Sequence, residues 1–328
     1  MKPNIAFITG GYSGEAVISY ESAKTIEANL DRELYNIYKI DITPEGWWYE
    51  DTQGSKTAVD KNDFSVVVHE KKISFDAVLI GIHGTPGEDG KLQGYFDMLH
   101  IPYTSCDAAA SALTFNKRYT VAVAAFAGVA VAKSVHLFRH APVAPEAILQ
   151  QLKLPVFVKP NNGGSSIGMS KVSEPSELSA ALEKAFKEDA QVLVEEFIAG
   201  REFTIGVFKS KGEIIALPIT EVKSKKTFFD YEAKYVAGMS EEITPAVIEE
   251  AIAERVRSAA KKIYEVFNCR GIVRIDFIYN EEAGRPYMLE INTVPGQSAA
   301  SIVPQQVKAM GWTLKDFYSA LIENALNK

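Results

Sequence analysis

G-I-V-R-I-D-F-I-Y at residues 271–279 and Y-M-L-E-I-N-T-V-P-G at residues 287–296 flank a short polar connector. Both segments alternate between apolar and polar residues, which is the period of a strand with one buried face. The connector N-E-E-A-G-R-P at residues 280–286 has the composition of a hairpin loop. The sequence therefore predicts an antiparallel β-hairpin, with Leu289 and Ile291 on its apolar face.

The polar face of this hairpin carries the residues that point to chemistry. If the hairpin folds symmetrically about Ala283, Asp276 lies opposite Glu290 and Arg274 lies opposite Asn292. Two carboxylates that face each other across a strand pair repel, so a positive charge is needed between them. Mg²⁺ can supply it, because it takes one or two carboxylates and completes its shell with water and phosphate oxygens. For this stretch alone, a solvated hairpin face is the alternative.

Length and composition describe an ordinary globular protein. The chain has 328 residues, 47% hydrophobic and 23% charged, which predicts two or three domains. A net charge of -7 argues against non-specific nucleic-acid binding. Cys106 and Cys269 lie outside any C-x-x-C spacing, as in a reducing compartment. The N-terminus does not resemble a signal peptide, and the apolar run at 119–132 is too short for a bilayer. We expect a cytoplasmic protein without a membrane partner.

The N-terminal segment predicts a doubly wound α/β domain. A strand at residues 5–9 runs into G-G-Y-S-G-E, and an apolar-periodic helix follows through residue 30. The glycine turn lacks the full G-x-G-x-x-G spacing, so no dinucleotide site is predicted. Glu15 lies at the helix start, where the helix dipole favours a carboxylate in any protein.

A second loop of the same segment is rich in glycine. Strands are predicted at residues 35–40 and 77–81, and the second runs into G-I-H-G-T-P-G-E-D-G-K-L-Q-G at 81–94. His83 in this loop could donate to an anionic group or satisfy the backbone of the loop itself. The first domain is predicted to end near residue 101, where Pro102 breaks a helix.

The next segment contains L-P-V-F-V-K-P-N-N-G-G-S-S-I-G-M at residues 154–169. Its glycines permit close backbone approach to phosphates, Ser165 and Ser166 add hydroxyl donors, and Lys159 adds a positive charge. The spacing is not that of a Walker A loop, and a strand rather than a helix follows. The pattern indicates a hairpin lid over phosphates, with a plain linker as the alternative.

Three further stretches suggest ligand contacts. A turn at residues 195–198 is suited to presenting backbone groups to an adenine edge, although a charged surface turn is the alternative. T-F-F-D-Y-E-A-K-Y at 227–235 fits neither helix nor strand and indicates a substrate-covering loop. A helix is predicted from about Pro245 to Phe267. The P-G at 295–296 leaves the Gly296 N–H beside the hairpin, where it could stabilise a developing oxyanion.

The order of these motifs along the chain resembles the ATP-grasp pattern. The motifs are the strand that ends in Lys159, the Gly/Ser lid, the turn that begins with Glu195-Glu196, R-I-D-F and E-I-N-T-x-P-G. The fuller set, with G-G-x-S-x-E, H-G-x-x-G-E-D-G-x-L-Q-G and D-Y-E-A-K-Y, resembles the D-alanine–D-alanine ligase family over residues 10–303. The resemblance implies an N-terminal doubly wound parallel-sheet domain at residues 1–101. Two ATP-grasp lobes with antiparallel sheets would follow, at residues 102–195 with the lid and 196–328 with the metal site.

The resemblance also implies an activity. Members of the family join two D-alanines with ATP through a D-alanyl phosphate, for peptidoglycan precursor synthesis. ATP would be a substrate, two Mg²⁺ or Mn²⁺ ions would be bound, and the protein would be a homodimer.

The resemblance assigns roles to residues that match the family motifs. The implied metal ligands are Asp276, Glu290 and Asn292. The implied ATP contacts are Lys117, Lys159, Ser166, Glu195, Phe197, Ile198, Glu202 and Lys234. The first D-alanine would contact Glu15 and His83, and the second Lys234, Ser301 and the Ile302 backbone. A lid-closing triad would consist of Glu15, Ser165 and Tyr235. The oxyanion would be held by Arg274 and the Gly296 N–H.

Departures from the family pattern are few, and two other functions remain as alternatives. Many members carry Arg-Glu where this chain has Ala16-Val17. The intact D-Y-E-A-K-Y favours D-alanine over D-lactate as second substrate, by analogy. One alternative is another ATP-grasp carboxylate–amine ligase, of a D-serine, D-lactate or carboxylase type. The other is a non-catalytic nucleotide-binding module, against which the presence of Lys159, Arg274 and Glu290 argues.

Overall fold

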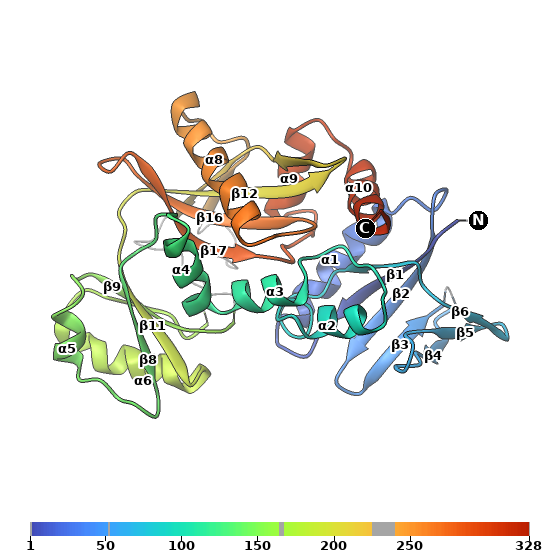
Figure 1. Ribbon diagram of the computed structural model, residues 1–328, viewed down its shortest axis with the longest axis horizontal. Helices are drawn as coiled ribbons and strands as arrows, with labels where there is room; N and C mark the ends of the chain where they lie inside the picture. The colour runs from blue at the N-terminus through green and yellow to red at the C-terminus, as the bar shows by residue number, and fades with distance from the viewer. Residues whose placement is uncertain (1, 52, 164–166, 225–239, 328) are drawn as a thin grey trace.

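The structure is a computed structural model that describes residues 2–51, 53–163, 167–224 and 240–327. The predictions for Ser165, Ser166, Lys234 and Tyr235 lie outside these ranges. The described residues form three main sheets, with the N-terminal sheet at one end, the central sheet at the other and the C-terminal sheet between and above them (Figure 1). Within the described ranges, no helix is both long and apolar enough to cross a membrane.

The N-terminal sheet is parallel from β2 to its edge strand β7, as predicted. It has the order β4-β3-β2-β1-β7, in which β1 pairs in parallel with both β2 and β7. The parallel strands are β1 (Asn4–Gly10), β2 (Asn36–Thr43) and β7 (Ala77–Ile80). Two antiparallel strands that the sequence analysis did not predict extend the sheet, β3 (Gly46–Glu50) and β4 (Lys56–Ala58). A separate small ribbon consists of β5 (Val66–Val68) and β6 (Lys71–Ile73).

Both faces of this sheet are buried, because alternate side chains of β1 point into different cores. Ile5 and Phe7 pack with α1 (Ala16–Asn29) and with α10 (Leu314–Leu326). Ala6 and Ile8 pack with the aromatic side of α2 (Lys91–Met98). Helix α10 comes from the other end of the chain and lies beside α1 in Figure 1. The N-terminal sheet therefore shares its core with the C-terminal helix.

The central sheet is entirely antiparallel, in the order β10-β9-β11-β8. Its strands are β8 (Ser134–Phe138), β9 (Val156–Pro160), β10 (Ser170–Val172) and β11 (Gln191–Glu196). The helices of this part of the chain are α3 (Ala108–Phe115), α4 (Lys117–Phe126), α5 (Pro145–Leu149), the 3₁₀ turn η1 (Pro175–Glu177) and α6 (Leu178–Glu188). Apolar residues of α5 and α6 cover one face of the sheet and form a core of their own.

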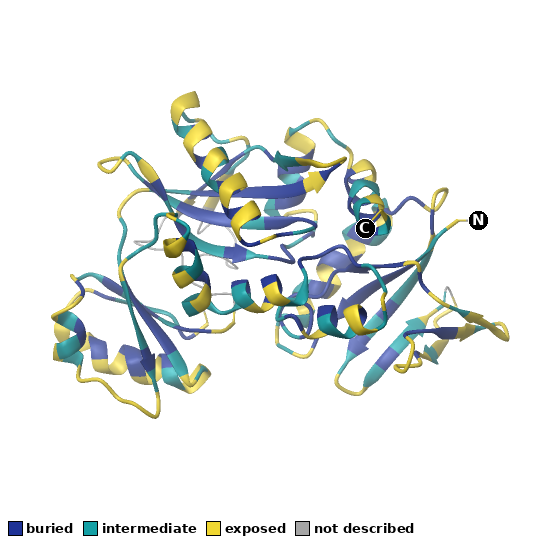
Figure 2. Ribbon diagram, viewed as in Figure 1, coloured by how far each residue is buried: buried dark blue, intermediate teal, exposed yellow. Residues whose placement is uncertain are grey.

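The C-terminal sheet is also antiparallel, in the order β15-β14-β12-β16-β17, with β13 paired to β12. Its strands are β12 (Arg201–Ser210), β13 (Glu213–Ala216), β14 (Thr220–Ser224), β15 (Ser240–Ile243), β16 (Val273–Asn280) and β17 (Arg285–Asn292). The helices are α8 (Glu250–Val266) and α9 (Ile302–Ala309). Figure 2 shows β12 and β16 buried along most of their length and α8 exposed on its outer side. The predicted α/β class, with a parallel sheet followed by two antiparallel ones, is confirmed.

One predicted helix boundary is wrong. Helix α8 begins at Glu250 rather than near Pro245. The Ala246 N–H donates to the Ile219 carbonyl at 2.7 Å, which keeps this segment extended beside β14. The predicted domain limits at residues 101 and 195 stay predictions, although each main sheet falls within one predicted domain apart from Glu196 at the end of β11.

The hairpin of β16 and β17 has the predicted pairing near its open end. Arg274 pairs with Asn292, and Asp276 pairs with Glu290. The turn is not symmetric about Ala283, however, because Asn280 pairs with Arg285. The register shifts by one residue directly after Asp276, as in a β-bulge.

The bulge changes which residues of β17 reach the core. Phe277 pairs with Met288, and both side chains lie in the core with Ile291. Leu289, which strict alternation placed on the apolar face, is only half-buried. The prediction for Leu289 is therefore wrong, because the extra residue of the bulge breaks the two-residue period at that point.

Candidate active site

Asp276 is the centre of the hairpin's polar face. Arg274 donates from Nε and Nη2 to its two carboxylate oxygens, at 2.9 and 2.8 Å. The Thr204 hydroxyl also donates to Asp276, and Asn292 Nδ2 lies 3.3 Å from Oδ2. In the structure, Arg274 thus supplies the positive charge that the facing carboxylates of Asp276 and Glu290 require. The bidentate geometry fixes both side chains.

Arg274 remains charged although it is largely buried. Burial opposes the charged guanidinium, but the carboxylates of Asp276, Glu290 and Glu88 raise its pKa above the ordinary value. Its side chain is 21% exposed, so it keeps access to a ligand in the site. A permanent cation at this point can stabilise a negative charge that develops on a substrate.

The donor set of the hairpin fits magnesium or manganese. It offers two carboxylates and the amide of Asn292 on adjacent strands. In the described part of the chain, no three His, Cys, Asp or Glu side chains gather as a metal cluster. An ion here would need oxygens from water or phosphate in addition, which is how Mg²⁺ is usually held.

A pocket beside the hairpin brings the predicted phosphate residues together. Its lining consists of Lys117, Lys159, Pro160, Asn162, Gly163, Ile167, Met169 and Glu290. These residues come from the start of α4, the end of β9, both described sides of the lid and strand β17. Lys117 Nζ donates to the Gly163 carbonyl at 2.6 Å, so this lysine contacts the lid loop. Two cations and a carboxylate thus surround one hollow between the central and C-terminal sheets.

The predicted adenine turn follows β11. Glu195 is 6% exposed and forms an ion pair with Lys159 on the neighbouring strand. The Phe197 N–H donates to the Pro155 carbonyl at 3.0 Å, so this backbone donor is already engaged. Lys171 lies over the Phe197 ring at 4.4 Å. Ile198 follows in the turn, and Glu202 lies on β12 opposite Ile278.

The residues predicted for the first substrate lie at the N-terminal end of α1. Glu15 occupies the N-cap position, as the sequence predicted. Gly84 packs against its carboxylate so closely that any side chain at Gly84 would collide with Glu15. Gly84 also has a φ of 67°, which glycine adopts without strain.

His83 is engaged by the protein itself. Its backbone N–H donates to Ser19 Oγ, and its Nε2 lies 2.9 Å from Ser22 Oγ. Burial lowers its pKa to about 4, although a hydrogen bond to the Val294 backbone acts in the opposite direction. His83 is therefore neutral at pH 7. Of the two interpretations of this residue, the contacts favour the one in which it satisfies protein groups.

Glu88 is a site residue that the sequence analysis missed. Its two oxygens accept from the Gly84 N–H at 2.6 Å and the Val294 N–H at 3.2 Å. Burial and the neighbouring Glu15 carboxylate raise its pKa to about 8. Glu88 thereby joins the glycine loop of the N-terminal sheet to the segment after β17. The signal was present, since Glu88 lies inside the quoted G-E-D-G motif.

Gly296 and the start of α9 adjoin each other. Ser301 is the N-cap residue of α9, but its hydroxyl bonds to Ser298 Oγ at 2.8 Å and does not cap the helix. A Cβ on Gly296 would lie 2.9 Å from Ser301 Oγ, so glycine permits this close approach. Ile302 is the first residue of the helix. The N-terminus of α9 is an arrangement that suits a carboxylate.

Two antiparallel lobes with paired lysines, an acidic hairpin and a glycine lid define the class of ATP-grasp enzymes. Solved structures agree with this class. The VanG D-Ala:D-Ser ligase from Enterococcus faecalis matches with a TM-score of 0.87 and 32% identity, over 99% of this chain and 100% of that one. A D-alanine–D-alanine ligase from Bacillus anthracis complexed with ATP matches with a TM-score of 0.79 and 27% identity, over 99% and 98%.

Sequence comparisons are more specific. The profile described as D-ala D-ala ligase N-terminus matches residues 4–106, and that of the C-terminus matches residues 116–323. A D-alanine–D-alanine ligase of Flavobacterium johnsoniae is 46% identical over 98% of this chain and 99% of its own length. One of Parabacteroides distasonis is 44% identical over 99% and 98%. The chain belongs to the D-alanine–D-alanine ligase family.

Proposed function

We propose that this protein is an ATP-dependent ligase that joins two D-alanines into D-alanyl-D-alanine for peptidoglycan precursor synthesis. The observation that carries the proposal is the shared pocket of Lys117, Lys159 and Glu290, next to the Asp276–Glu290 pair. A phosphate-binding hollow beside an oxygen-donor hairpin suits ATP-driven activation of a carboxylate. Family membership supplies the identity of the substrates.

The phosphate end of the site would work as follows. Asp276, Glu290 and Asn292 would hold two Mg²⁺ or Mn²⁺ ions, which neutralise the phosphate oxygens of ATP during transfer. Lys117 and Lys159 would bind the same phosphates from the opposite side of the pocket. The nucleotide would extend toward Glu195, Phe197, Ile198 and Glu202. The proposed contacts of Ser166 and Lys234 belong to segments that the structure does not describe.

The first step is formation of the acyl phosphate. The carboxylate of the first D-alanine attacks the γ-phosphorus of ATP, which forms the acyl–phosphate bond and releases ADP. Glu15 at the start of α1 pairs with the ammonium of this D-alanine. His83 lies beside it, where its backbone N–H bonds to Ser19 and its ring bonds to Ser22. Closure of the lid over the site is assigned to Glu15, Ser165 and Tyr235, as the family motifs imply.

The second step is the attack of the second D-alanine. Its neutral amine attacks the carbonyl of the acyl phosphate, and the tetrahedral intermediate expels phosphate. Arg274 and the Gly296 N–H stabilise the oxyanion of this intermediate. Ser301 and the Ile302 N–H bind the carboxylate of the second D-alanine at the start of α9, together with Lys234.

Product identification tests the proposal directly. The protein is incubated with ATP, Mg²⁺ and D-alanine, and the product is analysed by mass spectrometry. D-Alanyl-D-alanine with one ADP for each dipeptide is the expected result. Phosphate release that requires bicarbonate would instead indicate a carboxylase-type enzyme. Absence of ATP hydrolysis with every acid and amine would indicate a nucleotide-binding module.

A second candidate differs only in the second substrate. The solved VanG structure is named a D-Ala:D-Ser ligase and is 32% identical to this chain. Competition of D-alanine with D-serine and D-lactate at equal concentration distinguishes the candidates. We expect the D-alanyl-D-alanine product to predominate.

Light scattering of the purified protein tests the proposed homodimer, and fractionation of cells tests the proposed cytoplasmic location.

A further inference from the structure

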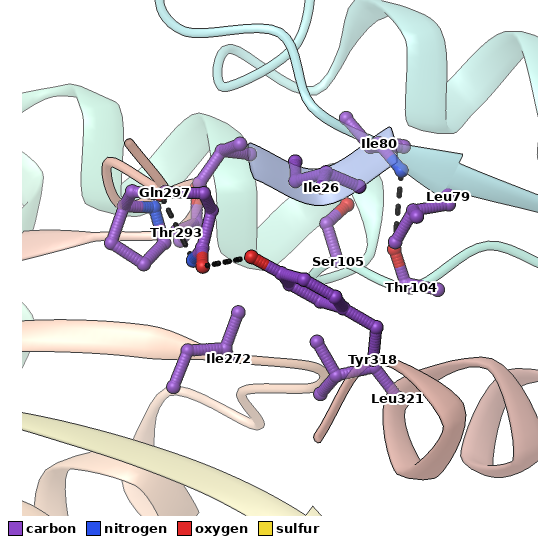
Figure 3. A pocket seen from close by; sticks show the side chains of 12 residues that line it. Ile26, Leu79, Ile80, Thr104, Ser105, Ile272, Thr293, Gln297, Tyr318 and Leu321 are labelled. Atoms are coloured by element: carbon purple, nitrogen blue, oxygen red, sulfur yellow. Dashed lines mark hydrogen bonds between the residues drawn. The ribbon is translucent and has the colours of Figure 1, made fainter. Parts of the chain in front are cut away.

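The loop T-V-P-G-Q at residues 293–297 follows β17, begins the connection to α9 and contains Gly296. Its last residue, Gln297, is 5% exposed and lies against Tyr318 of α10 (Figure 3). The Tyr318 hydroxyl donates to Gln297 Oε1 at 3.2 Å, and Gln297 Nε2 donates to the Pro295 carbonyl at 3.2 Å. The C-terminal helix thus reaches the loop through one buried hydroxyl.

Helix α1 contacts the same glutamine from the other side. The Gln297 N–H donates to Ser22 Oγ at 3.1 Å, and Ser22 is fully buried. Because Ser22 Oγ accepts this bond, its own proton is available for His83 Nε2, which lies 2.9 Å away. With Nε2 accepting from Ser22, the neutral ring of His83 carries its proton on Nδ1.

The loop is therefore held on both sides of Gly296. The Val294 N–H donates to the Glu88 carboxylate at 3.2 Å. Gln297 is bonded by Ser22 and Tyr318. Pro295 has no N–H and a restricted φ, so the polypeptide between these anchors has little freedom.

A small gap in the packing borders the loop on its inner side, although Val294 itself packs in the core of the N-terminal sheet. The residues around this small cavity include Ile26 of α1, Thr293 and Gln297 of the loop, and Tyr318 of α10 (Figure 3). A loop that borders a cavity loses van der Waals contacts on that side. Its orientation depends correspondingly more on the hydrogen bonds of Ser22 and Tyr318.

We propose that Ser22 and Tyr318 are positioning residues that orient the loop so that the Gly296 N–H faces the developing oxyanion. The inference rests on the proposed function, since it assigns that N–H to the tetrahedral intermediate. Neither hydroxyl would touch the substrate. Both act through Gln297, from helices near opposite ends of the chain.

Two buried tyrosines provide a matched test. Tyr318 and Tyr264 are 1% and 2% exposed, and each hydroxyl makes a hydrogen bond, that of Tyr264 to the Gly271 carbonyl at 2.9 Å. Tyr318→Phe and Tyr264→Phe should lower the melting temperature by similar amounts. Loss of a direct oxyanion donor costs about 100-fold or more, so an indirect displacement in Tyr318→Phe should lower kcat by roughly tenfold. KM for ATP should stay unchanged, and Tyr264→Phe should keep the wild-type kcat.

Ser22→Ala supplies an independent arm. Its matched control is Ser111→Ala, because Ser111 is also fully buried on a helix and donates to a backbone carbonyl. Ser22→Ala should lower kcat like Tyr318→Phe, and Ser111→Ala should not. The double variant of Ser22 and Tyr318 should lose less activity than the product of the two single effects, since both hydroxyls act through Gln297.

The outcomes separate this inference from the proposed function. If the wild type uses another acid and amine, the proposed function fails, and the variants are compared with that pair instead. A readout without turnover is the amide NMR shift of Gly296, which should move in Tyr318→Phe but not in Tyr264→Phe. Wild-type kcat and an unmoved Gly296 signal in both Tyr318→Phe and Ser22→Ala would overturn the inference. Equal loss of kcat in Tyr264→Phe would overturn it as well.

Discussion

Arg274 and Glu290 have different roles beside Asp276. Arg274 neutralises Asp276 through two hydrogen bonds, whereas Glu290 faces the lysine pocket. Under the proposed function, the carboxylate of Glu290 would therefore be the hairpin group that meets the metal and phosphates of the nucleotide. Asp276 holds the arginine in place and, under the proposed function, would also offer oxygens to an ion.

Glu290→Gln should leave the fold intact and lower kcat by at least about 100-fold, because a metal-ligating charge is lost beside the transferred phosphate. Glu282→Gln is the control, since Glu282 is exposed in the hairpin turn. Steady-state kinetics at saturating Mg²⁺ and circular dichroism measure the two properties. Wild-type turnover of Glu290→Gln at ordinary Mg²⁺ would contradict the metal assignment.

His83 should make stability depend on pH. Its pKa is about 4 in the folded protein and 6.5 in the unfolded chain, so the unfolded state binds the extra proton between these values. The contribution of the neutral His83 ring to the free energy of unfolding is therefore largest above pH 6.5. As the pH falls from 6.5 toward 4, the free energy of unfolding decreases by about 3 kcal/mol in total. Urea unfolding of wild type and His83→Gln from pH 4 to 8 measures it.

The difference between the two proteins isolates His83 from its neighbour. Glu88, whose pKa is raised to about 8, changes the free energy of unfolding in the opposite direction. Its contribution to stability decreases as the pH rises from 4.5 to 8. That contribution is present in both proteins and cancels in the comparison. A difference that is flat between pH 4 and 6.5 would show that His83 is not buried as a neutral ring.

Helix α9 substitutes for a missing strand contact in the C-terminal sheet. Strand β14 pairs with β12 only as far as Thr204, and β13 takes over at Val207. Between them, the fully buried Gln306 accepts from the Gly206 N–H at 2.9 Å and donates to the Thr204 carbonyl at 3.0 Å. One side-chain amide thus completes the ladder and ties α9 to the strand that supports Asp276.

Gln306→Leu should lower the free energy of unfolding by about 2 kcal/mol, because it leaves a buried N–H and a buried carbonyl unpaired. The neighbouring Gln305 is only half-buried and its side-chain bonds lie at the surface, so Gln305→Leu should stay within about 0.5 kcal/mol of the wild type. Urea unfolding curves measure both variants. Equal stability of the two variants would contradict the role of the Gln306 amide.

The C-terminal helix α10 packs in the same core as the first strand of the chain, β1. Phe317 of α10 is fully buried in the core that contains Ile5 and Phe7 of β1, and its ring lies 5.3 Å from that of Phe208. The N-terminal sheet therefore depends on a helix that is more than 300 residues away in sequence. We expect the two regions to unfold together.

Phe317→Ala should destabilise the protein by about 3–5 kcal/mol through the cavity it leaves. Phe126 is 96% exposed, so Phe126→Ala is a matched control that should change stability by less than about 0.5 kcal/mol. Urea unfolding followed by fluorescence of Trp47, in the N-terminal core, and by circular dichroism measures the effect. A separate Trp47 transition in Phe317→Ala would contradict a shared unit.

Local patterns predicted several of the elements that carry the candidate site. The alternation of residues 271–279 predicted a strand, and the glycine motifs predicted the loops at the ends of β1, β7 and β9, because strand period and turn chemistry act over a few residues. The Asp276–Glu290 pairing was also predicted correctly, but on an incorrect assumption about the turn. With the observed turn and a regular ladder, Asp276 would face Leu289, and only the bulge restores Glu290.

The sequence by itself determined the parallel strands of the N-terminal sheet, the two strands of the hairpin, the order of the motifs and the residue types available for chemistry, since these depend on near neighbours. Only the tertiary structure decided that Arg274 neutralises Asp276, that Glu88 bonds to Val294, and that α10 supports the N-terminal sheet. The last two contacts join residues far apart in the chain, and the first depends on the partners that surround the hairpin. They are selected by burial and by the pairing of polar groups that the folded chain removes from water, which no local period records.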